Sequence, residues 1–170
     1  MKQTGVTRKI DELGRIVIPK EIRKNLGIRD GDAIEIFTSD ESIILKKYFE
    51  VRKYSELSNK LCFLIKNIFN IDLIITDREK VITSSNTDII NESPLSKELI
   101  NLIDNREMFI SYELSTLNFN IDISGYFTIV PIIASSDSLG LVIILSENNI
   151  DYSSLGKFIA KIIADKIDIF

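Results

Sequence analysis

The stretch GVTRKIDELGRIVIPKEIR, residues 5–23, has two short apolar runs on either side of a turn, and a proline, Pro19, follows the second run. Val6–Ile10 and Arg15–Ile18 are rich in β-branched residues, and we predict a strand over each. Asp11–Gly14 between them has turn composition. The chain is therefore predicted to begin with β-structure.

Pro19 marks the end of the second predicted strand. Its fixed φ suits the first turn of a helix, so we predict a helix of about two turns over Lys20–Leu26. Gly27 then provides the left-handed residue that ends such a helix. Farther on, the pattern predicts two strands joined by a hairpin turn: Ala33–Phe37, Ser39–Ser42 and Ile43–Lys47.

The first 53 residues contain only 20 apolar residues. A domain of this size has too little core to be stable alone and usually depends on a disulfide, a metal or a second chain. The chain has one cysteine and no histidine. A homodimer that shares one core between two copies is therefore expected.

Charge is distributed unevenly along the chain, whose net charge is -4. Residues 1–53 hold 12 Lys+Arg against 9 Asp+Glu, whereas residues 54–170 hold 9 against 16. A basic N-terminal domain on an acidic protein indicates a partner with many negative charges, although a merely solvated basic face is the alternative. The candidate binding residues are Arg8, Lys9, Arg15, Lys20, Arg23 and Lys24.

Composition excludes several classes of function. Without histidine the chain has no Ser-His-Asp triad and no imidazole ligand for a metal, so we expect it not to be an enzyme or a metalloprotein. Cys62 is expected to be a buried small hydrophobe rather than a redox sensor. No signal peptide or membrane span is predicted, and a cytoplasmic location is expected.

The region from residue 54 to residue 170 has the pattern of an α+β domain. Its order is helix, two strands, helix, three strands, helix, which predicts an antiparallel sheet. Predicted helices cover residues 54–69, 93–103 and 152–168, and predicted strands cover 71–76, 81–83, 108–114, 126–134 and 139–145. Pro131 is expected at a bulge or an edge.

The first and last helices of this region carry apolar stripes wider than one sheet face needs. Leu57, Leu61, Leu64, Ile65 and Ile68 form the stripe on the first helix. Such stripes pack helix against helix, so they predict a contact between subunits, with burial inside one subunit as the alternative.

Residues 1–48 resemble the AbrB family of bacterial transition-state regulators. The resemblance is carried by the run from Gly5 to Arg23, by Leu26-Gly27-Ile28, by 31–36 and by 43–48. It implies a swapped-hairpin β-barrel formed by two chains that binds double-stranded DNA, with DNA contacts from Arg8, Arg15 and Arg23 and support from Lys9 and Lys24. Relatives often have arginine at position 24, and lysine there keeps the charge without the planar fork.

The chain as a whole is similar to longer members of this family, in which a GAF-like domain follows the AbrB-type domain. That resemblance implies a tetrameric, nucleoid-associated regulator, both activator and repressor, of late-stage sporulation genes. The expected domains are 1–53 and 54–170. No cofactor is expected, although an unidentified small molecule is a possible ligand of the GAF-like domain, where Tyr112, Tyr126 and Phe127 are candidate lining residues.

An antitoxin or another transition-state regulator is the alternative function, because the same swapped-hairpin domain occurs in toxin-neutralising proteins. Those typically add a short segment that is disordered until it wraps a partner. Here the added region has 56 apolar residues in 117, so it is expected to fold. RNA is disfavoured because no stacking aromatics accompany the basic residues.

Overall fold

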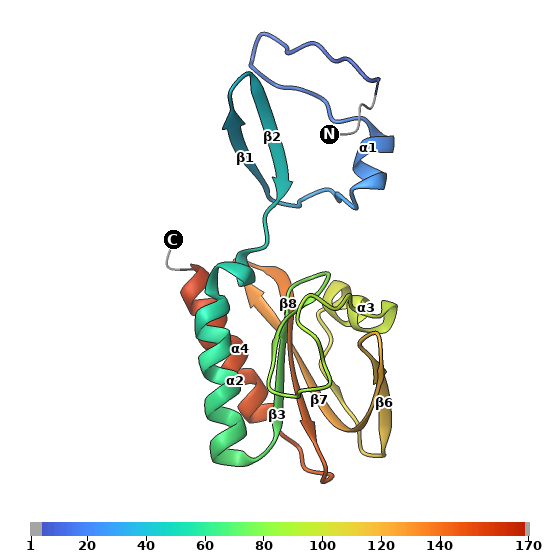
Figure 1. Ribbon diagram of the computed structural model, residues 1–170, viewed down its shortest axis with the longest axis vertical. Helices are drawn as coiled ribbons and strands as arrows, with labels where there is room; N and C mark the ends of the chain where they lie inside the picture. Colours follow the sequence, from blue (N-terminus) through green and yellow to red (C-terminus); the bar gives the residue numbers. More distant parts are fainter. Residues whose placement is uncertain (1–4, 169–170) are drawn as a thin grey trace. The chain divides into compact units, whose positions relative to one another are not determined.

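A computed structural model describes residues 5–168, which form two compact units that divide between Tyr48 and Phe49 (Figure 1). The expected division after residue 53 falls within a short 3-10 helix, η1 (Glu50–Tyr54). Val51 of η1 is fully buried in a core of the second unit. The chain that leaves the N-terminal unit is therefore anchored in the C-terminal unit from its first turn.

Within its described residues, 5–48, the N-terminal unit contains one helix and one hairpin. Helix α1 covers Lys20–Asn25, and Gly27 follows it with φ of 63°, as predicted for its terminator. Strands β1 (Ile34–Ser39) and β2 (Ser42–Lys47) pair antiparallel, with Ile36 opposite Leu45. The predicted helix and hairpin are confirmed to within two residues at each end.

The two strands predicted over Val6–Ile10 and Arg15–Ile18 are wrong for the single chain: neither segment pairs with a strand among the described residues. The turn between them does form, because the Gly14 amide donates to the Asp11 carbonyl at 2.9 Å and the Asp11 amide to the Arg15 carbonyl at 3.0 Å. A strand exists only when a neighbour completes its hydrogen-bond ladder. These segments have β composition but no neighbour within the chain.

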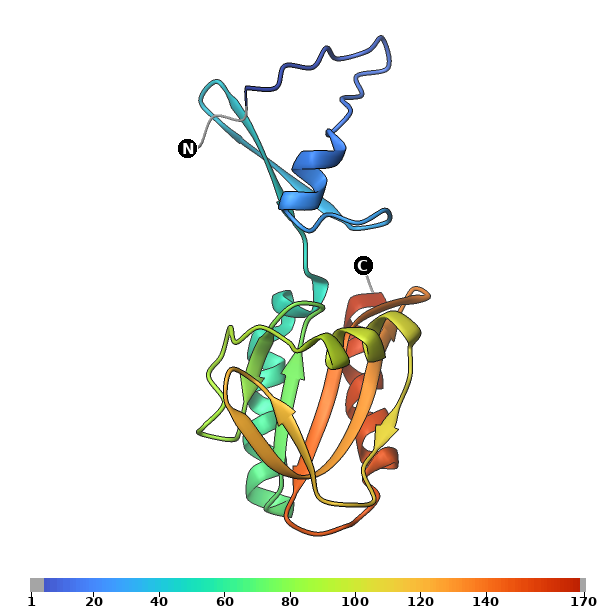
Figure 2. The same ribbon diagram turned by 90° about the vertical axis from the view of Figure 1, so that its right-hand side faces the viewer.

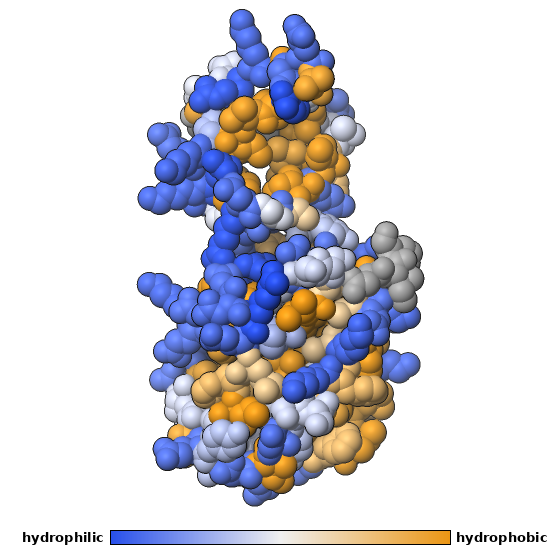
Figure 3. Space-filling view, turned by 180° about the vertical axis from the view of Figure 1, so that it is seen from behind, coloured by the Kyte–Doolittle hydropathy of each residue, from blue (hydrophilic) through white to orange (hydrophobic). Residues whose placement is uncertain are grey.

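The N-terminal unit has no interior of its own. None of its described residues, 5–48, is buried. Figure 3 shows apolar side chains gathered on its surface, and the large apolar residues that are exposed are Val6, Ile10, Leu13, Ile16, Val17, Leu26, Ile36, Phe37, Ile43 and Leu45. An exposed apolar surface of this kind marks an interaction site.

The C-terminal unit is built on a six-stranded antiparallel sheet of order β4-β3-β8-β7-β5, with β6 paired to β7 (Figures 1 and 2). The strands are β3 (Asp72–Thr76), β4 (Val81–Ser84), β5 (Phe109–Ile110), β6 (Ser115–Asn118), β7 (Asp122–Ala134) and β8 (Asp137–Ser146). The α+β class with an antiparallel sheet is confirmed.

Side chains of the central strands point alternately to the two faces of the sheet, and a hydrophobic core lies on each face. Leu73 and Ile75 of β3 belong to one core and Ile74 to the other, as the two-residue period of a strand requires. Helices α2 (Ser55–Phe69) and α4 (Ser153–Asp168) cover the first core. Helix α3 (Lys97–Asn105) covers the second (Figure 2).

Two predicted elements differ in detail, and one strand was not predicted. Helix α3 begins at Lys97, where the Ser96 side chain caps it, rather than at Ser93-Pro94. The strand predicted over 108–114 is reduced to two residues, and β6 was not predicted because its Ser, Thr and Asn side chains lack an apolar pattern. Pro131 lies beside the bulge at Ile132/Ile133, beyond the part of β7 that pairs with β5, as expected for a residue without an N–H.

None of the helices within residues 5–168 is long and apolar enough to cross a membrane.

Candidate nucleic-acid interface

The six predicted binding residues lie on two neighbouring segments of the N-terminal unit. Arg8, Lys9 and Arg15 belong to the extended segment and its turn, while the other three belong to α1. Five of the six are exposed, and Arg23 is half-buried. These cationic side chains are therefore accessible to an external partner.

Arg15 is held by the side chain of Asp11. Its Nε donates to Asp11 Oδ2 at 2.8 Å, and its backbone amide donates to Asp11 Oδ1, also at 2.8 Å. The Leu13 amide donates to the same Oδ1 at 3.0 Å. One carboxylate thus closes the turn and orients the guanidinium at its end.

These hydrogen bonds favour the ionised form of the Asp11 carboxyl. The backbone amide of Arg15, and then its side chain, hold the pKa of Asp11 below its ordinary value. The carboxylate that orients Arg15 therefore stays charged at neutral pH.

Arg23 is fixed from α1 toward the loop that follows. Its Nη1 contacts Asp30 Oδ1 at 2.7 Å, and its Nε is buried and has no hydrogen-bond partner among residues 5–168. Lys47 of β2 closes the same region, donating to the Gly27 carbonyl at 2.9 Å beside an ion pair with Asp32 at 3.3 Å. Neither Lys47 nor Asp32 was among the predicted binding residues, because their contact joins segments that are distant in the sequence.

The remaining cations have few partners in the chain. Arg8 donates to the carbonyl of its neighbour Thr7 at 3.0 Å. Lys9, Lys20 and Lys24 make no ion pair with any residue in the part of the chain that the structure describes. Exposed cations without internal partners suit phosphate contacts, since they need not first break a bond within the protein.

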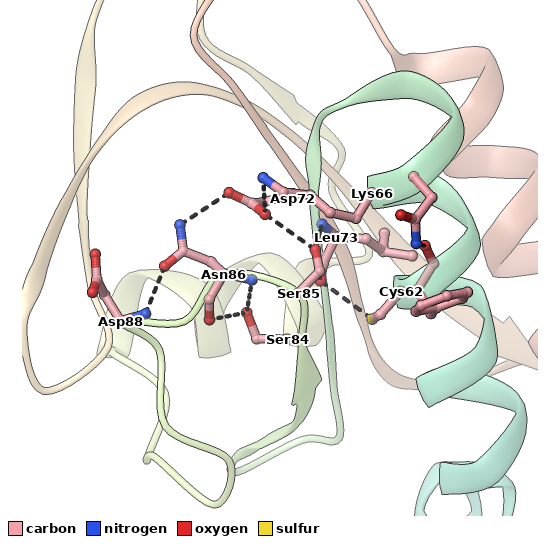
Figure 4. Close-up of polar contacts among 10 residues, drawn as sticks. Cys62, Lys66, Asp72, Leu73, Ser84, Ser85, Asn86 and Asp88 are labelled. Carbon is pink, nitrogen blue, oxygen red and sulfur yellow. Dashed lines mark hydrogen bonds and ion pairs between the residues drawn. The ribbon is translucent and has the colours of Figure 1, made fainter.

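A cavity of about 550 Å³ opens at one end of the C-terminal sheet. Asp72 is part of its wall, held by Lys66 Nζ at 2.9 Å, Ser85 Oγ at 3.2 Å and Asn86 Nδ2 at 3.0 Å (Figure 4). Further acidic residues in the wall are Asp88, Asp122 and Glu147.

The aromatic residues considered for a ligand cavity do not line this one. Phe127 is buried in the core beneath α3, and Tyr112 is largely exposed. The aromatic side chains of β7 were therefore a poor guide to the position of the cavity, because a buried ring fills space in the core rather than bordering a void.

Cys62 faces the core from α2, as expected for a small hydrophobe. Its Sγ donates to the Leu73 carbonyl at 3.3 Å (Figure 4). Burial raises the pKa of the thiol to about 12, so it stays protonated at physiological pH. No group of three or more His, Cys, Asp or Glu within residues 5–168 is arranged to hold a metal ion.

The apolar stripe of α2 is only partly buried. Ser58, Cys62 and Ile65 face the sheet, whereas Leu64 and Ile68 of the predicted stripe are exposed, so the alternative of burial inside one subunit does not hold for these two side chains. Those two side chains are exposed because the buried face is rotated toward Cys62. Phe63 and Phe69 of α2 and Phe158 of α4 are exposed as well, and we call these five side chains the helical apolar patch.

The chain matches two family models that together cover most of its length. Residues 7–52 match the family described as antidote-toxin recognition MazE, bacterial antitoxin. Residues 54–167 match the stage V sporulation protein T C-terminal, transcription factor family. The two matches meet near residue 53, and the second covers more than half of the chain.

Known proteins resemble the whole chain or one part of it. Stage V sporulation protein T of Bacillus subtilis (strain 168) is 35% identical over 156 residues, which are 87% of this chain and 86% of that protein. Transition state regulatory protein AbrB of the same organism is 65% identical over 48 residues, 28% of this chain and 50% of AbrB.

A solved structure shares the fold of the larger part. Residues 122 to 287 of a methyl-accepting chemotaxis protein are 13% identical, with a TM-score of 0.50 over 71% of this chain and 95% of that one. The sequence identity of 35% to a sporulation protein extends over 87% of this chain and 86% of that protein. Together with the family match over residues 54–167, it assigns the chain to a family. The chain belongs to the stage V sporulation protein T family of transcription factors.

Proposed function

We propose that this protein is a DNA-binding regulator of late-stage sporulation genes that acts as activator at some promoters and as repressor at others. The observation that carries the proposal is the set of six exposed or half-buried cations on residues 8–24, and the identity of 65% to AbrB over 48 residues supports it. The protein acts on the chromosome, in the cytoplasm, without an enzymatic step.

The cations divide by the contact that each side chain is able to make. Lys9, Lys20 and Lys24 act as point charges on phosphate and supply affinity for any sequence. Arg8, Arg15 and Arg23 carry a planar fork that bonds bidentately to a guanine edge or a phosphate, so they are the proposed readers.

Binding of a labelled duplex from a sporulation promoter tests the function. We expect the affinity to fall steeply with salt, with a slope of about -0.9 for each phosphate neutralised. A scrambled duplex should bind more weakly than the promoter, and a hairpin RNA more weakly still. Absence of duplex binding by the full chain in low salt would refute the proposal. Genome-wide mapping of bound sites in sporulating cells then identifies the targets.

A second copy of the chain is the proposed partner of the N-terminal unit. Residues 5–48 contain no buried residue, and the segments with β composition before α1 lack strand neighbours among the described residues. A swapped-hairpin barrel provides both missing parts, because the partner's strands complete the ladders and its apolar side chains close the core.

The helical apolar patch is the proposed second contact between subunits. It presents Phe63, Ile68 and Phe158 to solvent on the two helices that cover one face of the sheet. Helices pack through such faces, and a contact there between two dimers gives a tetramer.

Substitutions that place charge in each contact separate the two interfaces. The full chain is expected to be a tetramer in light scattering at micromolar concentration. Ile36→Asp should leave dimers held by the helical apolar patch, whereas Ile68→Asp should leave dimers held by the N-terminal unit. The double variant is expected to be monomeric. A monomeric wild-type protein would contradict both contacts, and a tetrameric single variant would contradict the contact it alters.

The C-terminal unit is the proposed sensor, a GAF-like domain. The cavity of about 550 Å³ is large enough for a small molecule, although its wall does not identify one. An antitoxin function is favoured by the match over residues 7–52 alone. The added region folds around two cores instead of remaining a disordered wrapping segment, so we favour the regulator. Recovery of a stoichiometric small toxin with the tagged protein would reverse this preference.

A further inference from the structure

We propose that Asp11 is a positioning residue for the DNA contact of Arg15, and this inference rests on the proposed function. Asp11 holds the guanidinium by its Nε, at 2.8 Å from Oδ2. The hydrogen bonds of Arg15 leave its two terminal nitrogens without a partner among the described residues. Those nitrogens form the fork that recognises a guanine edge or a phosphate.

The geometry at Asp11 couples the backbone of the turn to the Arg15 side chain. Oδ1 accepts the amides of Leu13 and Arg15, at 3.0 and 2.8 Å, while Oδ2 accepts the guanidinium. The position of Arg15 is therefore set twice by one carboxylate, at the backbone and at the side chain. An arginine held in this way has lost much of its rotamer freedom before DNA arrives.

The ion pair between Asp11 and Arg15 contributes little to the stability of the fold. The Arg15 side chain is 72% exposed and that of Asp11 is 42% exposed. Ion pairs at such exposure contribute little to folding, because water and salt screen them. The remaining effect of the ion pair is that it restricts the conformations of the Arg15 side chain on the proposed DNA-binding surface.

Charge and positioning predict opposite effects for the loss of the carboxylate. By charge alone, a negative group beside a DNA-binding arginine repels phosphate, so its removal should tighten binding. If Asp11 orients Arg15, its removal should weaken binding, because the arginine must then be ordered during association. The sign of the change separates the two explanations.

Asp11→Asn is the informative variant. The asparagine Oδ1 still accepts the two amides of the turn, but its Nδ2 cannot accept the Arg15 Nε–H. Glu12→Gln is the matched control, since it removes the same charge from the next residue, which is exposed and makes no hydrogen bond or ion pair with the Arg15 side chain. Both variants are made in the full chain and titrated with the promoter duplex at one salt concentration.

We expect Asp11→Asn to weaken duplex binding about fivefold, the low-end cost of ordering one long side chain in each of the two subunits. Glu12→Gln should bind as tightly as the wild type or more tightly. An Asp11→Asn affinity equal to or above that of the wild type would overturn the inference. Equal weakening by both variants would overturn it too, since a general effect of the turn would then explain the loss.

A spectroscopic readout distinguishes positioning from a general loss of structure. In the wild type the NMR signal of the Arg15 Nε–H should shift with the ionisation of Asp11, with a midpoint below the ordinary pKa of an aspartate. The Gly14 amide signal should keep its position in Asp11→Asn, because the turn is retained. A displaced Gly14 signal would assign the effect to the turn and overturn the inference.

The two proposals fail in different ways. If the wild-type protein binds no duplex, the proposed function is wrong and the role of Asp11 falls with it. If Arg15→Ala loses binding while Asp11→Asn does not, only the positioning role is wrong. Adding Asp11→Asn to Arg15→Ala should cause no further loss, because a positioning residue acts through the group that it positions.

Discussion

Replacement of Arg15 by alanine is expected to weaken binding of the promoter duplex by about two orders of magnitude. A bidentate contact between arginine and a base contributes about 1–3 kcal/mol, and the proposed dimer presents Arg15 twice. Because each 1.4 kcal/mol is a tenfold change in affinity, the loss of both contacts reaches about a hundredfold. Fluorescence anisotropy of the labelled duplex measures the effect.

Controls separate this effect from unfolding and from general charge. The Arg15 side chain is 72% exposed, so the thermal midpoint of the variant should stay that of the wild type. Lys60→Ala removes one positive charge from the exposed surface of α2 and should change affinity little. Arg15→Lys, which keeps the charge without the fork, should recover only part of the affinity. Wild-type affinity in Arg15→Ala would show that this arginine does not contact DNA.

Replacement of Arg52 by alanine is expected to lower the free energy of unfolding of the C-terminal unit by about 3 kcal/mol. Asp77 is fully buried, and its Oδ2 is paired with Arg52 Nε from η1. Removal of one partner of a buried ion pair leaves a charge without compensation, which costs about 3–5 kcal/mol. We take the lower end of that range because Arg52 is 35% exposed. Urea unfolding followed by circular dichroism measures the loss.

A compensating substitution tests the cause. Asp77→Asn removes the buried charge, and its Oδ1 still accepts the amides of Glu79 and Lys80 as the carboxylate does. Combined with Arg52→Ala, it should restore much of the lost stability, because no buried charge then remains unpaired. If the double variant is no more stable than Arg52→Ala, the ion pair is not the source of the effect. This pair also anchors η1, the first turn after the N-terminal unit.

Local patterns predicted most of the elements. Gly27 ends α1 and the hairpin follows, since turn and helix ends depend on residues close in sequence. The helices that cover the C-terminal sheet were predicted for the same reason. Strand β6 was missed because Thr116 and Asn118 are polar, and their pairing with β7 depends on residues that follow the turn.

In the candidate site, too, some features were predicted from the sequence and others were not. Arginines and lysines on residues 8–24 are visible in the sequence as an excess of positive charge, and all six are exposed or half-buried in the structure. The contacts of Asp11 with Arg15 and of Asp30 with Arg23 were not predicted, since the pairing of two side chains depends on the path of the backbone between them.

The sequence by itself determined the charge division, the turn and helix of the N-terminal unit and the α+β class of the C-terminal unit, all of which depend on composition or on neighbouring residues. Only the tertiary structure decided that residues 5–18 have no strand partner within one chain, that the face of α2 with Ile68 is exposed, and that Asp11 holds Arg15. Ladders, buried faces and ion pairs each need two surfaces, and the chain's three-dimensional path determines which surfaces meet.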